Sequence, residues 1–404
     1  MKICFIEPLN NIFQPFRDED RQVNFFVSMV WGLSVVSWLR FVFLRIPFLS
    51  ELTEYVVPAF VSLVIIFSLR HLVKLYSLKD FSFWIILSLI YLLYYWLGPS
   101  QNAVFMEEYI PAFFFTVSTF FFVGKAVNDD VFDVFYWLAV LTILFKFISI
   151  FITHDLEEYF LQEEAQETQG RAYEVLPYAL YVLWYLLKRF SLLSLAVFAL
   201  SLFMFFAFGC RGVLLCVLTF IILYVFLVKR VMKNRMLFFL CLIIITVGYY
   251  HIEDILLYIS DIFAGLGYST RIINIFLIEG LSYDSGRGDL QVQMFDALQY
   301  HPFGLGICGA QGVTGSYSHN FFYEFVLSFG WIFGSIICVG VFYYLFKAYK
   351  ACANDEQKGF FLVLFCESVI HLFVSDIVWK EPYFFMLLGY SAMLIGKNKK
   401  TQII

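Results

Sequence analysis

The 404 residues are 61% hydrophobic and only 15% charged, with a formal net charge of −5. Soluble domains are about 45–50% apolar, and a water-soluble core could not hide this much apolar surface. The composition therefore excludes an ordinary soluble enzyme and predicts that lipid surrounds most of the chain. A nucleic-acid partner is not expected.

The N-terminal segment MKICFIEPLNNIFQPFRDEDRQ mixes apolar residues with acids. It lacks the succession of basic, apolar and small residues that marks a removable signal peptide. We interpret it as a short interfacial helix that precedes the first membrane span.

Twelve segments are apolar enough to be membrane-spanning helices, for which about 20 mostly apolar residues are needed. In chain order, these predicted spans are centred near residues 23–44, 54–73, 81–97, 108–124, 131–152, 173–187, 190–208, 211–228, 236–250, 319–346, 359–376 and 379–396. The sequence therefore predicts an all-α polytopic membrane protein with about 12 transmembrane helices.

Lysine and arginine indicate the orientation of the spans, because they accumulate in cytoplasmic loops. With both termini in the cytoplasm, all but eight of the 27 basic residues fall on the cytoplasmic side. The eight exceptions lie in outer loops or in the outer part of a span: Arg40, Arg45, Lys146, Arg171, Arg211, Arg271, Arg287 and Lys380.

This orientation places two larger loops outside, an acidic one at about 153–172 and a longer polar one at about 251–318. The cytoplasmic loops are short, and no internal repeat or linker marks a second domain. We expect a single integral membrane domain over residues 1–404, with candidate site residues in the loop 251–318.

The eight cysteines are scattered in or beside apolar segments, and no two of them form a C-x-x-C pair. Cysteines in such a setting are mostly small buried hydrophobic residues. A structural disulfide or a metal site is the less favoured alternative.

Two of the exceptional arginines stand beside glycines. Arg211 lies in a Gly-Cys-Arg-Gly break between two spans, where an arginine is costly unless paired or functional; a snorkelling side chain is the alternative. Arg287 lies between Gly286 and Gly288, and a helix is predicted from Asp289. A glycine-rich helix start with a guanidinium can bind phosphate, although an ordinary solvated turn has the same composition.

His319 begins the tenth predicted span, where Ser318 or Asn320 can cap the helix. On such a helix, His319 would share a face with Tyr323. Glu324 would share another face with Asn320. A histidine at the membrane boundary suits proton transfer, since its ordinary pKa is about 6.5. A boundary residue with a satisfied ring is the alternative.

Other polar residues keep open roles. Glu367 and His371 lie four residues apart in one predicted span, and Lys146 lies in another. An ionisable group inside a membrane needs a partner, so Glu367 lines a pocket, pairs with Lys146, or is a neutral packing residue. His301, followed by Pro302, is interpreted as shaping its loop.

The motifs stand in a particular order: Cys210-Arg211-Gly212, Ser285-Gly286-Arg287-Gly288, His301-Pro302-Phe303-Gly304-Leu305-Gly306, and His319-Asn320 with Glu324 and Gly330. This order and its placement among the spans resemble the O-antigen ligase and polymerase superfamily, the Wzy-type polymerases and the related ligases. The resemblance covers residues 208–334; elsewhere only the number of spans and the hydropathy agree. Cys210 stands where the family often has serine.

The resemblance implies a glycosyltransferase C-like fold in the bacterial inner membrane, with an active site that faces the periplasm. Glycan would be carried on undecaprenyl diphosphate, with Arg211 and Arg287 on the diphosphate and His319 as the base. No D-x-D motif stands in an external loop, so neither a metal nor another cofactor is expected. The candidate substrate-binding residues are Asn320, Tyr323, Glu324, Gly286, Gly288 and His301.

The leading hypothesis is an O-antigen or capsule-type polymerase, which transfers the growing glycan to an incoming lipid-linked repeat unit. An O-antigen ligase, which attaches the same glycan to lipid A–core, is the close alternative; the acidic loop argues mildly against its anionic acceptor. A flippase or transporter is a third hypothesis, favoured by Glu367 and Lys146. Candidate protein partners are a chain-length regulator and a flippase of the same pathway.

Overall fold

The computed structural model of the chain describes residues 77–152, 165–208, 210–228, 252–265, 277 and 287–401. The predicted N-terminal helix and the predicted spans 23–44, 54–73 and 236–250 lie outside these residues. Each regular element in the described ranges is a helix, which confirms the all-α prediction.

Five helical stretches in the described part of the chain are long and apolar enough to cross a membrane: Leu78–Leu97, Ser100–Ala126, Asp129–Ile148, Arg211–Val228 and Phe321–Ala351. A shorter apolar helix runs over Leu192–Ala207. These long apolar helices indicate a membrane protein. The number of 12 spans, their orientation and the side of each terminus stay predictions.

The chain divides into two compact units. The first comprises Met1–Leu138, Gly286–Gln357 and Ser368–Ile404, and the second comprises Ala139–Ser285 and Lys358–Glu367. Compact units can form within one membrane-embedded domain, so the assignment of residues 1–404 to a single domain stays a prediction.

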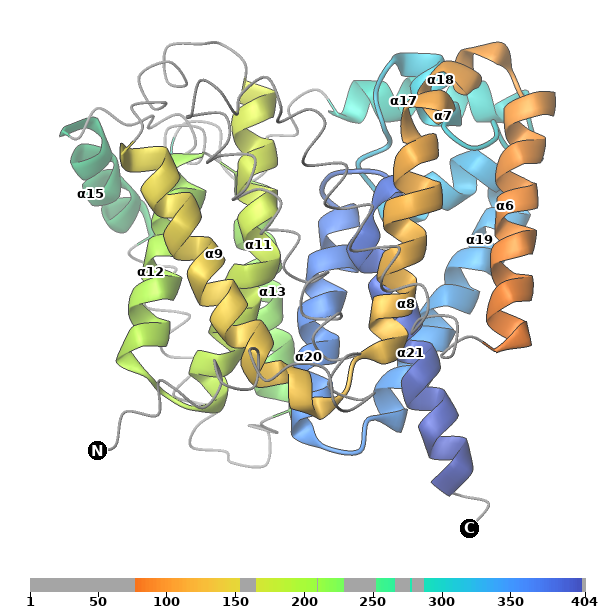
Figure 1. Cartoon of the computed structure of the whole chain (residues 1–404). Coiled ribbons are helices and arrows are strands. Elements are labelled where there is room, and N and C mark those ends of the chain that lie inside the picture. The colour runs from red at the N-terminus through yellow and green to blue at the C-terminus, as the bar shows by residue number, and fades with distance from the viewer. Residues whose placement is uncertain are drawn as a thin grey trace, which may run out of the picture. The chain divides into compact units, whose positions relative to one another are not determined.

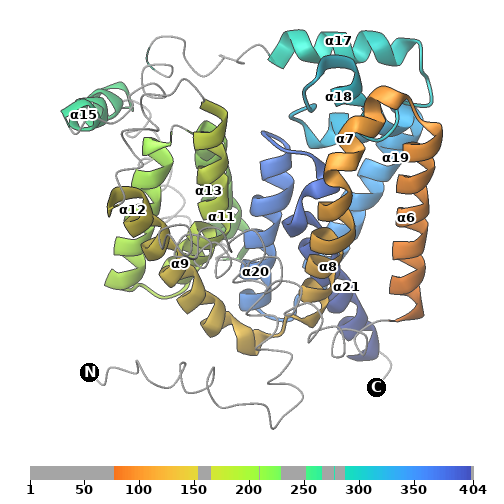
Figure 2. The same cartoon turned by 45° about the horizontal axis from the view of Figure 1, so that its top comes forward.

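The helices of the first unit are α6 (Leu78–Leu97), α7 (Ser100–Pro111), η1 (Ala112–Val117), α8 (Ser118–Ala126), η2 (Asp129–Val131), α17 (Arg287–Gln299), α18 (Gly309–Thr314), α19 (Phe321–Ala351), η6 (Val378–Lys380) and α21 (Pro382–Thr401). In both views, α17 and α18 lie at the end of this unit where α6 ends and α7 begins (Figures 1 and 2). That end carries the polar segment whose residues are the sequence-predicted candidates.

The second unit contains α11 (Ala165–Lys188), α12 (Leu192–Ala207), α13 (Arg211–Leu223), η3 (Tyr224–Val228) and α15 (Ile252–Gly265). Three helices run across the boundary between the units: α9 (Phe132–Ile152), α20 (Asp355–Phe365) and η5 (Cys366–Ile370). Because α11 begins at Ala165, residues 165–172 of the predicted acidic loop are helical. The placement of residues 153–172 in a periplasmic loop stays a prediction.

Two glycines bring α8 and α21 of the first unit into backbone contact. A Cβ atom added to Gly124 would lie 2.1 Å from the carbonyl oxygen of Met386. One added to Gly389 would lie 1.9 Å from the carbonyl oxygen of Phe121. Small residues let apolar helices approach closely enough to gain dispersion contacts, so this pair of helices forms the tight core of the unit.

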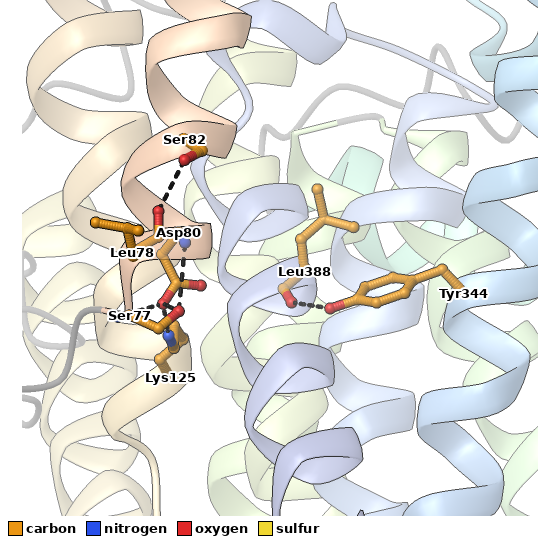
Figure 3. A network of polar contacts seen from close by, with 7 residues as sticks. All are labelled: Ser77, Leu78, Asp80, Ser82, Lys125, Tyr344 and Leu388. Carbon is orange, nitrogen blue, oxygen red and sulfur yellow. Dashed lines mark hydrogen bonds and ion pairs between the residues drawn. The ribbon is translucent and has the colours of Figure 1, made fainter.

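At the opposite end of the first unit, an ion pair joins the start of α6 to the end of α8. Ser77 and Asp80 form a reciprocal capping box at the start of α6, which satisfies two otherwise unpaired backbone donors. The ammonium group of Lys125, at the end of α8, pairs with the same Asp80 carboxylate (Figure 3). On the neighbouring helices, the Tyr344 hydroxyl donates a hydrogen bond of 3.3 Å to the Leu388 carbonyl.

Gly330 breaks α19, because its φ of 79° and ψ of 168° are not helical. The break frees carbonyl groups one turn earlier. The backbone N–H of Leu305 donates to the Leu327 carbonyl at 2.6 Å, and that of Gly306 donates to the Ser328 carbonyl at 3.1 Å. The HPFGLG motif therefore supplies the donors that the broken helix lacks, which fixes the polar segment on α19.

Candidate functional site

The polar segment 287–320, here named the cap, has a small apolar core of its own. Leu290, Met294 and Leu298 are spaced by four residues, so they share one face of α17. Met294 and Leu298 are buried together with Leu305 and Leu327, and Leu290 packs against this cluster. On α7, the Asn102 side chain donates to the carbonyls of Leu305 (2.8 Å) and Ile307 (3.1 Å). The cap is thus held on both α19 and α7.

Arg287 is the first residue of α17, so the helix begins two residues before the predicted Asp289. Gly288 consequently lies in the first helical turn, and Gly286 lies outside the described residues. The Arg287 guanidinium Nη1 donates to the Val374 carbonyl at 3.0 Å. A cation at a helix N-terminus opposes the helix dipole, whereas an anion bound there would be favoured by both the dipole and the guanidinium.

His319 lies outside the helix that it was predicted to begin. Asn320 is the N-cap of α19, and its side-chain oxygen accepts from the backbone N–H groups of Phe322 (2.9 Å) and Tyr323 (3.2 Å). The backbone of His319 is left-handed, with φ of 51°. The prediction that His319 and Tyr323 share a helical face is therefore wrong, because the helix starts after the cap residue.

The His319 ring lies against the Tyr317 ring, with centroids 4.1 Å apart. Its Nδ1 atom is buried without a hydrogen-bond partner among the described residues. Burial lowers the pKa of His319 to about 4, the positive charge of Arg287 contributes to the shift, and Asp376 opposes it. The imidazole is therefore neutral near pH 7 and can accept a proton.

Glu324 and Tyr323 serve the local structure of the cap. The Glu324 carboxylate is buried and accepts from the Ser318 hydroxyl at 3.1 Å. The Tyr323 ring meets the Phe295 ring edge-on, with centroids 4.8 Å apart. These contacts hold the turn before α19 against α17, and a direct contact of either residue with a sugar stays a prediction.

Three successive residues after η5 connect the cap to the rest of the site. The Val374 carbonyl accepts from Arg287, and Ser375 Oγ lies 3.3 Å from the Tyr317 hydroxyl. The Asp376 carboxylate lies 3.0 Å from the Lys380 ammonium group. We name residues 374–376 the contact turn, because a cation, a tyrosine and a second cation each bind one of its residues.

Lys380 is the residue that the sequence-based search for site residues missed. Its ammonium group lies 5.3 Å from the centre of the Tyr109 ring, and the Tyr109 hydroxyl accepts from the Gln311 side chain at 2.9 Å. A signal for Lys380 was present in the sequence, since it is one of the eight basic residues on the predicted outer side. The contact turn itself carries no sequence motif.

Two predicted residues are not brought to the contact turn by the described contacts. Arg211 is the first residue of α13 and belongs to the second unit, and its role on the diphosphate stays a prediction. His301 has an exposed side chain just after α17. Its carbonyl accepts from the Gly304 N–H at 2.9 Å, in keeping with a role in shaping the loop.

Lys146 and His371, two of the residues whose roles were left open, have partners in the structure. Lys146 of α9 forms an ion pair with Glu174 of α11. His371 Nδ1 lies 3.7 Å from a carboxylate oxygen of Glu381, with both side chains buried.

Comparison of the chain with protein-family models, with curated proteins and with solved structures found no match. The chemistry of the site therefore rests on its own residues. It combines two cations, a neutral histidine and a carboxylate at the contact turn. Such a group can bind a phosphate anion and accept a proton from a neighbouring hydroxyl.

The lowered pKa of His319 predicts a pH dependence of stability. Between about pH 4 and 6.5 the unfolded chain binds a proton at this residue that the folded protein excludes, so stability falls as the pH drops through this window. His319→Gln should lose that part of the dependence. Thermal unfolding of both proteins in detergent at pH 4–7.5 measures the difference. Parallel curves for the two proteins would contradict the burial of a neutral His319.

Proposed function

We propose that the protein is a membrane glycosyltransferase that polymerises undecaprenyl-diphosphate-linked repeat units at the periplasmic face of the bacterial inner membrane. The observation that carries this proposal is the contact turn, where Arg287 binds Val374 and Lys380 pairs with Asp376, and where the charges of Arg287 and Asp376 act on the neutral His319. The turn belongs to a unit that contains long apolar helices, as a site for a lipid-linked substrate requires. The order of the sequence motifs, which resembles that of the O-antigen ligase and polymerase superfamily, supports undecaprenyl-diphosphate-linked glycan as the donor.

In the proposed reaction, a hydroxyl oxygen of the acceptor sugar attacks the anomeric carbon of the donor glycan. The new glycosidic bond forms as the bond from that carbon to the phosphate oxygen breaks. The electron pair of that bond stays with the departing undecaprenyl diphosphate, and the hydroxyl proton passes to a ring nitrogen of His319. Fixed cations stabilise the negative charge that develops on the leaving group, which is the role of Arg287.

The base must be neutral before the reaction and must lie near the developing charge. His319 meets the first condition because burial and Arg287 lower its pKa to about 4. It meets the second because its ring lies against the ring of Tyr317, whose hydroxyl reaches the contact turn at Ser375. When a bound diphosphate compensates the charge of Arg287, protonation of His319 becomes easier, so the substrate itself strengthens the base.

The proposal is tested by reconstitution of the purified protein in phospholipid vesicles with an undecaprenyl-diphosphate-linked repeat unit as the sole substrate. We expect a ladder of longer glycans, formed equally well in the presence of EDTA. Gel separation of the labelled glycans measures the result. Products that form only after lipid A–core is added would establish the ligase instead. An absence of glycan transfer to either acceptor would contradict the proposal.

A further inference from the structure

Lys380 and Asp376 form an ion pair whose place suggests more than a structural role. The two side chains are four residues apart, and they are 34% and 24% exposed. Because both side chains are partly exposed, a competing anion can reach the pair.

The surroundings of the pair favour an anion. Arg287 places a second cation on Val374, two residues before Asp376. Asp376 itself has a left-handed backbone, with φ of 65°, a conformation that costs energy for a residue other than glycine and recurs at functional sites. Its carboxylate also accepts from the N–H of Ile377 at 2.8 Å, so it keeps a partner if Lys380 turns away.

We infer that the Asp376–Lys380 pair is the closed state of a phosphate-binding site. A phosphate of the lipid-linked donor replaces Asp376 as the partner of Lys380 and is held between Lys380 and Arg287. The identity of the donor rests on the proposed function, whereas the anion site rests on the contact turn alone.

The exchange of partners also gives Asp376 a role in proton transfer. Once Lys380 binds phosphate, the Asp376 carboxylate is no longer neutralised by it. Burial and Arg287 lower the pKa of His319, while Asp376 raises it. The released carboxylate therefore stabilises protonated His319, which ties proton transfer to the presence of the donor. In this scheme Lys380 binds the substrate and Asp376 is a positioning residue.

Binding of phosphate compounds tests the role of Lys380. We would titrate the purified protein in detergent with undecaprenyl diphosphate, inorganic pyrophosphate and phosphatidylglycerol, and follow binding by calorimetry. A charge-assisted hydrogen bond is lost in Lys380→Ala, so we expect affinity for both diphosphates to fall by roughly 10-fold or more. Lys380→Arg should retain binding. Lys350→Ala, which removes a lysine in the last turn of α19, is the matched control and should bind as the wild type does.

Asp376→Asn provides the decisive comparison. It removes the competing anion, so diphosphate affinity should rise by about 3-fold or more, while kcat for glycan transfer should fall by about 10-fold or more because protonated His319 loses its counter-ion. A purely structural ion pair would make Asp376→Asn and Lys380→Ala weaken binding alike. That result, or equal binding by Lys380→Ala and the wild type, would overturn the inference.

The same measurements distinguish a lipid headgroup from the lipid-linked donor as the source of the phosphate. They also distinguish failure of this inference from failure of the proposed function. Binding of phosphatidylglycerol with the same dependence on Lys380 would show a lipid headgroup site and overturn the donor assignment. Lys380-dependent binding of diphosphates by a protein without transferase activity would refute the proposed function and leave the anion site standing. Glycan polymerisation that is unchanged in Lys380→Ala would refute the inference alone.

Discussion

Replacing Arg287 with alanine is expected to lower glycan transfer at least about 100-fold, because a fixed donor to the developing negative charge is lost. Arg287 stands at the N-terminus of α17 and is anchored on the Val374 carbonyl. Its guanidinium is thus positioned before the substrate arrives. Arg287→Lys keeps the charge but loses the two-pronged geometry, so we expect partial activity. Initial rates in reconstituted vesicles measure both effects.

Arg189→Ala is the matched control for Arg287. This arginine is exposed and directly follows α11, so its removal should leave the rate unchanged. All three variants should accumulate in the membrane and unfold at the temperature of the wild type to within a few degrees. A normal glycan ladder from Arg287→Ala would remove this residue from the site.

Gly330→Ala is expected to lower the free energy of unfolding by about 3 kcal/mol or more. The glycine has φ of 79° and ψ of 168°, a combination that is essentially closed to residues with a Cβ atom. The added Cβ would also lie 2.2 Å from the Pro302 carbonyl oxygen. The cap would have to move away from α19, so activity should be lost together with stability. Thermal unfolding in detergent measures the change.

Gly340 supplies the control within the same helix. No atom lies within 4 Å of a Cβ added there, and alanine is the better helix former. Gly340→Ala should therefore unfold at the same temperature as the wild type or slightly above it. If the two glycine variants were equally stable, the proposed attachment of the cap through the break in α19 would be wrong.

Hydropathy located the five helices that are long and apolar enough to cross a membrane, since only a helix satisfies a long apolar backbone in lipid. The other predicted spans stay predictions. The predicted span 211–228 coincides with Arg211–Val228, and 81–97 lies within Leu78–Leu97. Helix starts were less accurate. Both Ser318 and Asn320 are residue types that can cap α19. In the structure Asn320 is the cap, and the Ser318 hydroxyl binds Glu324 instead, a contact that is visible only in three dimensions.

Only part of the candidate site could be predicted from the sequence. Arg287 and His319 stood out because they lie in a polar segment of a very apolar chain. Their partners did not, because the Arg287–Val374 contact joins residues 87 positions apart and the contact turn has no motif. The left-handed backbone of His319 was also unforeseen, since few residues other than glycine adopt it. Lys380 could have been predicted as a site residue from its charge on the predicted outer side. Its pairing with Asp376 could not have been predicted.

The glycine contacts between α8 and α21 also constrain the biogenesis of the protein. A ribosome synthesises α8 first, then residues 139–285 of the other unit, and α21 only after all of these. Until α21 is inserted, Gly124 of α8 lacks the helix whose backbone it contacts. The first unit therefore completes its packing late. Interrupted insertion should leave a protein with apolar helices in the membrane and without this pair of packed helices.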